Sequence, residues 1–262
     1  MVDSIDLIAI CVSTITFVIV NQTIVKYLRP ESITINTFLD WKFRNIFTSL
    51  LHSFIVGFGI LYVILSDGSI VSDMMSGQSE AGEAFLCIST GYFVYDLMLS
   101  ITNLQYPGRV EIIVHHVITL SCLAVSLYNK KFLAYCMVGL TVEISSFFIH
   151  VRELLILSGV YKTSIVYFLN SILTIFTLIV FRFLPLSWIS IGLYTDRQHI
   201  GLPLLLMAVL FLVIIFMVSS VLLYRVVISD CNSAITRHVI HFIATITNKF
   251  HLKCSSKVKK FF

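Results

Sequence analysis

The chain has 262 residues, of which 58% are hydrophobic and 12% charged, with a net charge of +4 and a mean hydropathy of +0.95. Roughly 25% of the residues of an average soluble domain are charged, so this composition excludes an ordinary soluble protein. Most of the net charge lies in the C-terminal tail, and no aromatic–basic platform indicates nucleic-acid binding. The sequence therefore predicts a membrane protein that crosses the bilayer several times.

Seven apolar stretches approach the ~20 residues that a helix needs to cross a bilayer. The predicted spans are 7–25, 46–65, 85–102, 112–128, 132–151, 163–184 and 201–224. Acidic residues precede the first span and basic residues follow it, a pattern typical of a retained signal anchor and not of a cleaved signal peptide. We expect the seven spans to pack in chain order as antiparallel helices, because the loops between most of them are short.

Lysine and arginine are distributed unevenly between the two sides that alternating spans define. Of the 18 basic residues, 14 fall on the side of the C-terminal tail, three on the other side and one within a span. The outer loop 66–84 is instead acidic. By the positive-inside rule, the N-terminus is exoplasmic and the tail is cytosolic.

The tail, residues 229–262, carries features of its own. Apolar residues recur near one helical face of the segment 235–250, which is typical either of a helix on the cytosolic membrane surface or of a solvated tail. Cys231 and Cys254 are candidate palmitoylation sites. The last residues, Lys259-Lys260-Phe261-Phe262, resemble a dilysine retrieval signal to the endoplasmic reticulum.

A short set of ionisable side chains lies within the predicted spans, where such groups are costly and rarely accidental. They are His52, Asp96, His115, His116, Glu143, His150 and Arg182. A rise of 1.5 Å per residue places the adjacent histidines ~5–8 Å, and Asp96 ~9 Å, inside the cytosolic ends of their spans. His52 is expected at a similar level and Glu143 nearer mid-depth. Three neighbouring helices should thus present imidazole and carboxylate in one layer of the cytosolic half.

The adjacent pair His115 and His116 is the strongest candidate for chemistry. A nearby carboxylate fixes the tautomer of an imidazole and makes it a usable general base, or a nucleophile that accepts an acyl group. Polar side chains between helices also serve as plain hydrogen-bonded contacts, and the sequence leaves both interpretations open. A metal site is not favoured, because ligands on one helix face need a spacing of three or four residues and no thiolate lies nearby.

Two further features concern how the helices pack. Arg182 precedes Leu184-Pro185, where we expect the helix to kink or end. Its side chain is interpreted either as an interfacial residue that reaches toward the membrane surface, or as the partner of Glu143. Gly57 and Gly59 are expected to permit close packing of helices.

Several of these residues belong to an ordered series of motifs that resembles the TLC domain. The motifs are Trp41-Lys-Phe-Arg-Asn45, Ser49-Leu-Leu-His-Ser53, Gly91-Tyr-Phe-Val-Tyr-Asp96, His115-His-Val-Ile-Thr119, Glu143-Ile-Ser-Ser146 with Arg152, and Phe181-Arg-Phe183. The resemblance divides the chain into a first span with its linker (1–39), a TLC domain (40–228) and a basic tail (229–262).

The resemblance implies an all-α membrane protein in which six helices form a barrel-like bundle around a lipid-accommodating tunnel, with the first span added. In ceramide synthases, which share the domain, paired histidines and two aspartates line the tunnel and transfer an acyl chain from acyl-CoA to a sphingoid base. His115 and His116 match the pair. Glu143 and Ser146 stand where the two aspartates are expected, so the second carboxylate of that reaction is missing.

Two functions follow from the resemblance. The run into Ser229-Asp230-Cys231 looks similar to the small TLC proteins that regulate phospholipid composition and membrane fluidity. This implies lipid binding in the helical barrel, membrane lipids as partners, no cofactor, and the plasma membrane as location, with the endoplasmic reticulum as the alternative. A translocon-associated or transporter role has no supporting feature.

The second function is a lipid acyltransferase that takes acyl-CoA as co-substrate. The residues implied for catalysis are His115, His116, Glu143 and Asp96. Those implied for contact with the lipid, in either function, are His52, Tyr92, Ser146 and Arg182.

Overall fold

The computed structural model describes the backbone of residues 3–34, 36–104 and 109–258, and the side chains of most of these residues as far as residue 230. The described residues form helices joined by turns, with no strand among them. In chain order these are α1 (Ser4–Ile19), η1 (Val20–Ile24), α2 (Val25–Leu28), α3 (Glu31–Thr34), α4 (Thr37–Ser66), α5 (Glu80–Thr102), α6 (Arg109–Asn129), α7 (Leu133–Leu140), α8 (Val142–Leu157), α9 (Ile165–Leu178), η2 (Ile179–Phe183), α10 (Leu184–Asp196) and α11 (Leu202–Val258). The segments η1 and η2 are π-helical turns that continue the α-helices before them.

The predicted seven spans are confirmed. Seven helical stretches of the described residues are long and apolar enough to cross a membrane. They are Ser4–Thr23, Thr37–Ser66, Glu80–Thr102, Val110–Asn129, Leu133–Leu157, Ile165–Asp196 and Leu202–Asp230. The second begins earlier than predicted because Asn36 caps it, its side-chain oxygen accepting hydrogen bonds from the backbone N–H groups of Phe38 and Leu39.

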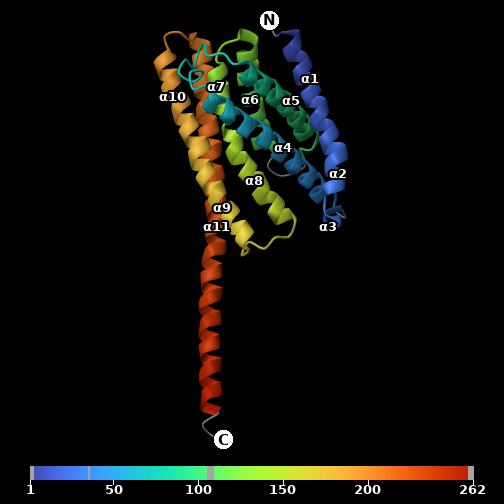
Figure 1. Ribbon diagram of the computed structural model, residues 1–262, viewed down its shortest axis with the longest axis vertical. Coiled ribbons are helices and arrows are strands. Elements are labelled where there is room, and N and C mark those ends of the chain that lie inside the picture. The colour runs from blue at the N-terminus through green and yellow to red at the C-terminus, as the bar shows by residue number, and fades with distance from the viewer. Residues whose placement is uncertain (1–2, 35, 105–108, 259–262) are drawn as a thin grey trace.

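Successive spans run in alternate directions, so the N-terminus lies at one end of the bundle and α11 leaves it at the other (Figure 1). We call these the outer end and the inner end, after the exoplasmic and cytosolic sides expected from the charge distribution. Packing is most extensive among α1, α4, α5, α6, α8 and α9: α1 lies on α5, α4 on α5 and α8, α5 on α6, and α8 on α9. α10 and α11 stand to one side of this group (Figure 1).

Close approach of the packed helices depends on glycine at two positions. A Cβ atom on Gly57 of α4 would lie 2.8 Å from the backbone nitrogen of Ile144 in α8. A Cβ atom on Gly91 of α5 would lie 2.5 Å from the Cβ of Ser13 in α1. Any larger side chain would therefore push the helix backbones apart, as expected for glycine between membrane helices.

At the outer end, Lys130 joins α1, α5 and the turn between α6 and α7. Its Nζ lies 2.6 Å from Asp6 Oδ2 and 3.2 Å from Asp3 Oδ2, and it also binds Glu83. Partial burial opposes the charge, but hydrogen bonds to Asp6 and Glu83 raise the pKa of Lys130 above its ordinary value. The sequence placed Lys130 in an outer loop without a partner, so this contact was missed.

At the inner end, a buried ion pair ties α11 to the rest of the bundle. Arg152 of α8 donates to Asp230 of α11 from Nη2 to Oδ1 at 2.7 Å and from Nε to Oδ2 at 3.2 Å. Tyr167 and Ser171 of α9 donate their hydroxyl hydrogens to the same carboxylate. Three helices thus meet on one aspartate.

The sequence predicted that the sixth span would kink or end at Leu184-Pro185, and the span does not end there. It continues to Asp196, with Pro185 in the first turn of α10. The π-helical turn Ile179–Phe183 contains residue 181, whose carbonyl the proline ring would face in a regular helix. A locally widened turn before a proline relieves this clash and lets the helix continue.

The last helix runs straight through residue 229 and extends far beyond the inner end of the bundle (Figure 1). The side chains of residues 231–258 are not described, so the predicted amphipathic face and the palmitoylation candidates Cys231 and Cys254 stay predictions. The dilysine-like end, Lys259 to Phe262, lies outside the described residues.

Candidate functional site

Polar side chains from separate helices gather in the interior of the bundle. They are His52 of α4, Asp96 of α5, His116 of α6, Glu143 of α8 and Arg182 of η2, none more than 7% exposed. Ionisable groups in such surroundings need partners, because no water is available to solvate them. Their contacts form three groups.

The first group is centred on Glu143. The hydroxyl of Ser53 donates to Glu143 Oε2 at 2.6 Å, and His52 Nδ1 lies 3.7 Å from the same oxygen. Gly57 allows α8 to approach α4 closely, and Glu143 lies beside His52. The sequence had instead suggested that Glu143 lies nearer mid-depth than His52. The opposite nitrogen of His52, Nε2, is 3.3 Å from the hydroxyl of Ser89 in α5.

Tyr92 holds the imidazole of His52 from one face. The two rings are stacked with centroids 3.8 Å apart and planes 10° from parallel. The Tyr92 hydroxyl donates to Ser49 Oγ at 2.7 Å. Tyr92 was predicted to contact a lipid; in the structure it is buried against His52, so it positions this ring and does not itself face the cavity described below.

The second group pairs the other imidazole with the other carboxylate. His116 Nδ1 lies 3.4 Å from Asp96 Oδ2, which joins α6 to α5. The ring of Phe93 contacts both imidazoles, with its centroid 5.1 Å from that of His116 and 5.3 Å from that of His52. Two imidazole–carboxylate pairs therefore flank one buried aromatic ring.

The third group shows that the interpretation of Arg182 as an interfacial residue is wrong. This side chain is buried and does not reach toward the membrane surface. Its Nε donates to Ser145 Oγ at 3.1 Å and its Nη2 to Ser146 Oγ at 3.2 Å. Among the ion pairs of the described residues there is none between Arg182 and Glu143, so serines of α8 hold the guanidinium. The π-helical turn that carries Arg182 shifts the register of the helix and turns this residue inward.

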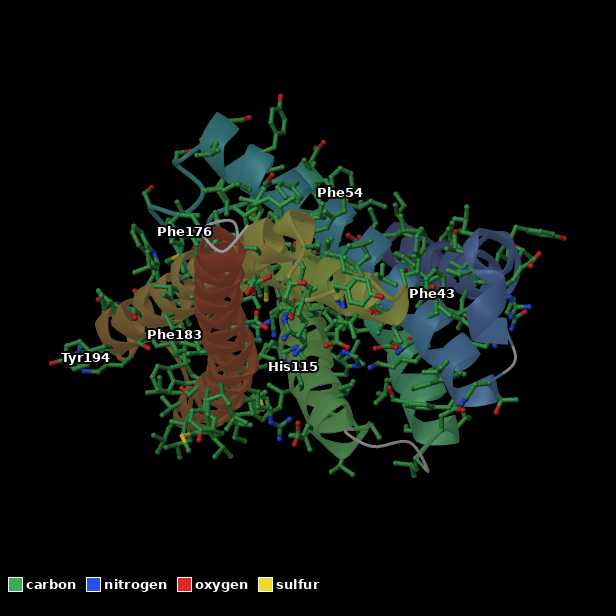
Figure 2. The ribbon with its side chains drawn as sticks, turned by 90° about the horizontal axis from the view of Figure 1, so that it is seen from below. Phe43, Phe54, His115, Phe176, Phe183 and Tyr194 are labelled. Carbon is green, nitrogen blue, oxygen red and sulfur yellow. The ribbon has the colours of Figure 1, made fainter. Side chains whose placement is uncertain are left out.

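His115 differs from its neighbour because it lines a cavity. Adjacent residues of a helix point about 100° apart, so His116 contacts α5 while His115, which is only partly buried, faces the other side. Figure 2 shows His115 in the space between α6 and α11. The two rings still lie close, with centroids 5.6 Å apart.

The cavity has a volume of about 190 Å³ and lies among α6, α7, α8, α10 and α11. Its polar lining includes His115, Thr119 and Glu143, and most of the remaining wall is apolar. α11 contributes one helical face, formed by Leu204, Met207, Ala208, Phe211, Leu212 and Ile215. Near the outer end the cavity meets Tyr135, whose hydroxyl donates to Asp196 Oδ2 at 2.7 Å. The space is therefore an apolar chamber with an imidazole and a carboxylate on its wall.

A polar stripe along α4 was missed by the sequence analysis. Asn45, Thr48 and Ser49 precede His52 and Ser53 at spacings of three and four residues, and all five are buried. Asn21 of η1 donates from Nδ2 to Thr48 Oγ1 at 3.2 Å. The spacing of these residues could have predicted the stripe, because polar residues that recur on one face of a membrane helix mark the face that contacts other helices.

These groups do not form a metal centre in the described part of the chain, where no three His, Cys, Asp or Glu side chains are arranged to hold an ion. The arrangement instead suits an amphiphilic molecule. An apolar portion fits against the aliphatic walls, while His115 and Glu143 can contact a polar group that lies beside them.

Comparison with known proteins identifies relatives of this chain. A family model described as TLC domain matches residues 42–228. The chain is 30% identical over 218 residues to TLC domain-containing protein 2 of Danio rerio, covering 83% of this chain and 87% of that protein. It is 27% identical over 190 residues to TLC domain-containing protein 2 of Homo sapiens, covering 72% of each. It is 22% identical over 209 residues to TLC domain-containing protein 1 of Mus musculus, covering 78% of this chain and 84% of that protein.

Proposed function

The chain belongs to the TLC domain family of multi-pass membrane proteins, and we propose that it binds a lipid acyl chain in the cavity beside α11. Through this binding it regulates the acyl composition of phospholipids and thereby the fluidity of the membrane. The observation that carries the proposal is the apolar chamber of about 190 Å³ with His115 and Glu143 on its wall.

The lining of the chamber favours a hydrocarbon chain over a polar solute. A polar solute would lose its hydration against mostly aliphatic walls, at a cost of about 2–7 kcal/mol for each group without a hydrogen-bond partner. A hydrocarbon chain has no such groups. His115, Thr119 and Glu143 supply a few polar contacts, which is the usual composition of a ligand pocket.

A substitution that fills the chamber tests the proposal. Ala208→Phe places an aromatic ring in the cavity, whereas Val209→Phe adds similar bulk on the neighbouring position, which is 46% exposed on the outside of α11. Cells that express wild type or either variant at matched levels are compared by phospholipid acyl-chain profiling. We expect Ala208→Phe to abolish the change in acyl composition that wild type produces, and Val209→Phe to retain it. Equal activity of the two variants would contradict acyl binding in this cavity.

A second function, acyl transfer from acyl-CoA, is favoured by the position of His115 on the cavity wall. In that reaction an imidazole nitrogen attacks the thioester carbonyl, the carbon–sulfur bond breaks, and CoA leaves as the thiolate. A lipid hydroxyl or amine then takes the acyl group and gives up its proton to the imidazole. His116 would position the neighbouring ring through its own contact with Asp96.

The two functions are separated by His115→Ala, with His116→Ala as a companion variant. Acyl transfer requires an imidazole, so purified wild-type protein given acyl-CoA should release CoA thiol and His115→Ala should not. A binding protein releases no CoA in either form. If His115→Ala retains the cellular lipid change, acyl transfer through this residue is excluded.

The membrane in which the protein acts belongs to the same proposal, and we place it in the plasma membrane. The alternative is the endoplasmic reticulum, indicated by Lys259 and Lys260, which lie outside the described residues. The double substitution Lys259→Ser with Lys260→Ser is therefore expected to leave the cellular distribution unchanged. Movement of the variant to the cell surface would overturn this location.

A further inference from the structure

An exposed ion pair lies about one helical turn from the histidine that lines the cavity. Glu111 precedes His115 by four residues on α6, which is about 6 Å along the helix axis. Arg225 of α11 reaches across to it, with Nη1 and Nη2 each 3.1 Å from one carboxylate oxygen. This ion pair joins α6 to α11, the two helices between which Figure 2 shows His115.

The position and exposure of the pair suit exchange with a ligand. Arg225 is 61% exposed and Glu111 55%, so their attraction is weakened by solvent and headgroups and contributes little to holding the helices together. Arg225 comes ten residues after Ile215, the last residue of α11 in the cavity wall, which is about 15 Å along the helix. The ion pair therefore stands at the level expected for lipid headgroups, beyond the apolar chamber.

We propose that Glu111 and Arg225 bind the headgroup of a zwitterionic phospholipid from the cytosolic leaflet, while one of its acyl chains occupies the cavity. The guanidinium binds the phosphate in the fork geometry that it now offers to a carboxylate. The freed carboxylate of Glu111 faces the headgroup cation. The glycerol ester region passes His115. This inference rests on the proposed function and adds the headgroup class and the side of entry.

Charge complementarity favours this occupant over other acyl carriers. A zwitterionic headgroup places one negative and one positive group a short distance apart, and the pair offers the two opposite partners. A fatty acid has a carboxylate but no cation, so it leaves Glu111 without a partner. Acyl-CoA carries several phosphate charges, for which Arg225 is one cation beside a repelling carboxylate.

The test uses purified full-length protein in lipid nanodiscs with photoactivatable probes that carry a diazirine on one acyl chain. Phosphatidylcholine and phosphatidylglycerol probes share that chain and differ in the headgroup cation. We expect Arg225→Gln to reduce labelling of cavity peptides by both probes about fivefold, as for loss of one charge-assisted contact. Glu111→Gln should lower the phosphatidylcholine to phosphatidylglycerol labelling ratio about threefold or more, because only the choline group loses a partner. Arg197→Gln, at the outer end, is the matched control and should change neither.

The outcomes separate this inference from the proposed function. If Glu111→Gln leaves the phosphatidylcholine to phosphatidylglycerol ratio unchanged while total labelling falls, the pair only holds α6 to α11 and the headgroup site is wrong. It is also wrong if an acyl-CoA or fatty-acid probe of the same chain loses more labelling in Arg225→Gln than phosphatidylcholine does. If Ala208→Phe leaves wild-type labelling intact, the proposed function itself fails. Loss of labelling in Ala208→Phe with no effect of Arg225→Gln overturns only the headgroup site.

Discussion

The α4–α5 side of the bundle and the α11 side are packed in different ways. In the apolar stretches of α4 and α5, 44% and 56% of the residues are buried inside the protein, against 6% in α11. The first side contains the glycine contacts and the imidazole–carboxylate pairs. The second borders the cavity. Apolar burial does little to drive helices together in lipid, so hydrogen bonds and close backbone contact make the first side rigid, and α11, which buries little of its apolar stretch, is packed more loosely.

The largest expected effect lies where the loosely packed α11 is tied to the rigid side. Asp230→Ala removes the carboxylate that Arg152, Tyr167 and Ser171 share. Breaking a buried ion pair leaves one charge uncompensated and costs about 3–5 kcal/mol in soluble proteins. Thermal unfolding in detergent should show a strongly reduced midpoint. Glu80→Ala, an exposed acidic residue at the outer end, is the control and should unfold like wild type.

The second prediction compares the same substitution on the two sides. Gly57→Ala introduces a Cβ 2.8 Å from the backbone of Ile144 and should cost about 1–3 kcal/mol through overpacking. In Gly139→Ala, on the cavity wall, the added Cβ comes no closer than 3.9 Å to Ile189 and should be tolerated. Detergent unfolding of the two variants measures the difference directly. Similar destabilisation of both would mean that the two sides are equally well packed.

The third prediction concerns a single hydrogen bond on the rigid side. Ser53→Ala removes the hydroxyl that donates to Glu143, and should cost about 1 kcal/mol, within the range found for contacts between membrane helices. Ser187→Ala is the control, because that hydroxyl binds only the carbonyl of Phe183 in its own helix and is exposed. A midpoint for Ser53→Ala no lower than that of the control would show that the bond does not stabilise the helix pair.

The sequence predicted the seven spans and the shared level of His116 and Asp96, because both depend on the length and composition of each apolar stretch. His116 and Asp96, placed at similar depth by the rise of a helix, do lie beside each other. Depth arithmetic does not give the rotation of a helix about its axis. It therefore could not tell which adjacent histidine faces the cavity, and it left both interpretations of Arg182 open.

The contacts missed from the sequence share a physical cause. The tie between Arg152 and Asp230 joins residues 78 apart, and its partners are fixed only once three helices have packed. The π-helical turns that aim Asn21 and Arg182 inward are shifts of hydrogen-bond register, which hydropathy does not report. The cavity likewise depends on where α11 stands, and α11 offers apolar residues on all sides.

The smallest expected effect separates two neighbouring residues that the sequence treated alike. His116→Ala leaves Asp96 in the interior without its imidazole and should lower stability by about 0.6 kcal/mol, the average for a polar contact between membrane helices. His115 faces the cavity, so His115→Ala removes less packing and should unfold like wild type. In the photolabelling assay the order should reverse, since only His115 lies on the wall that a ligand touches. Equal effects of both substitutions in both assays would mean that the boundary between the rigid side and the cavity does not run between these two residues.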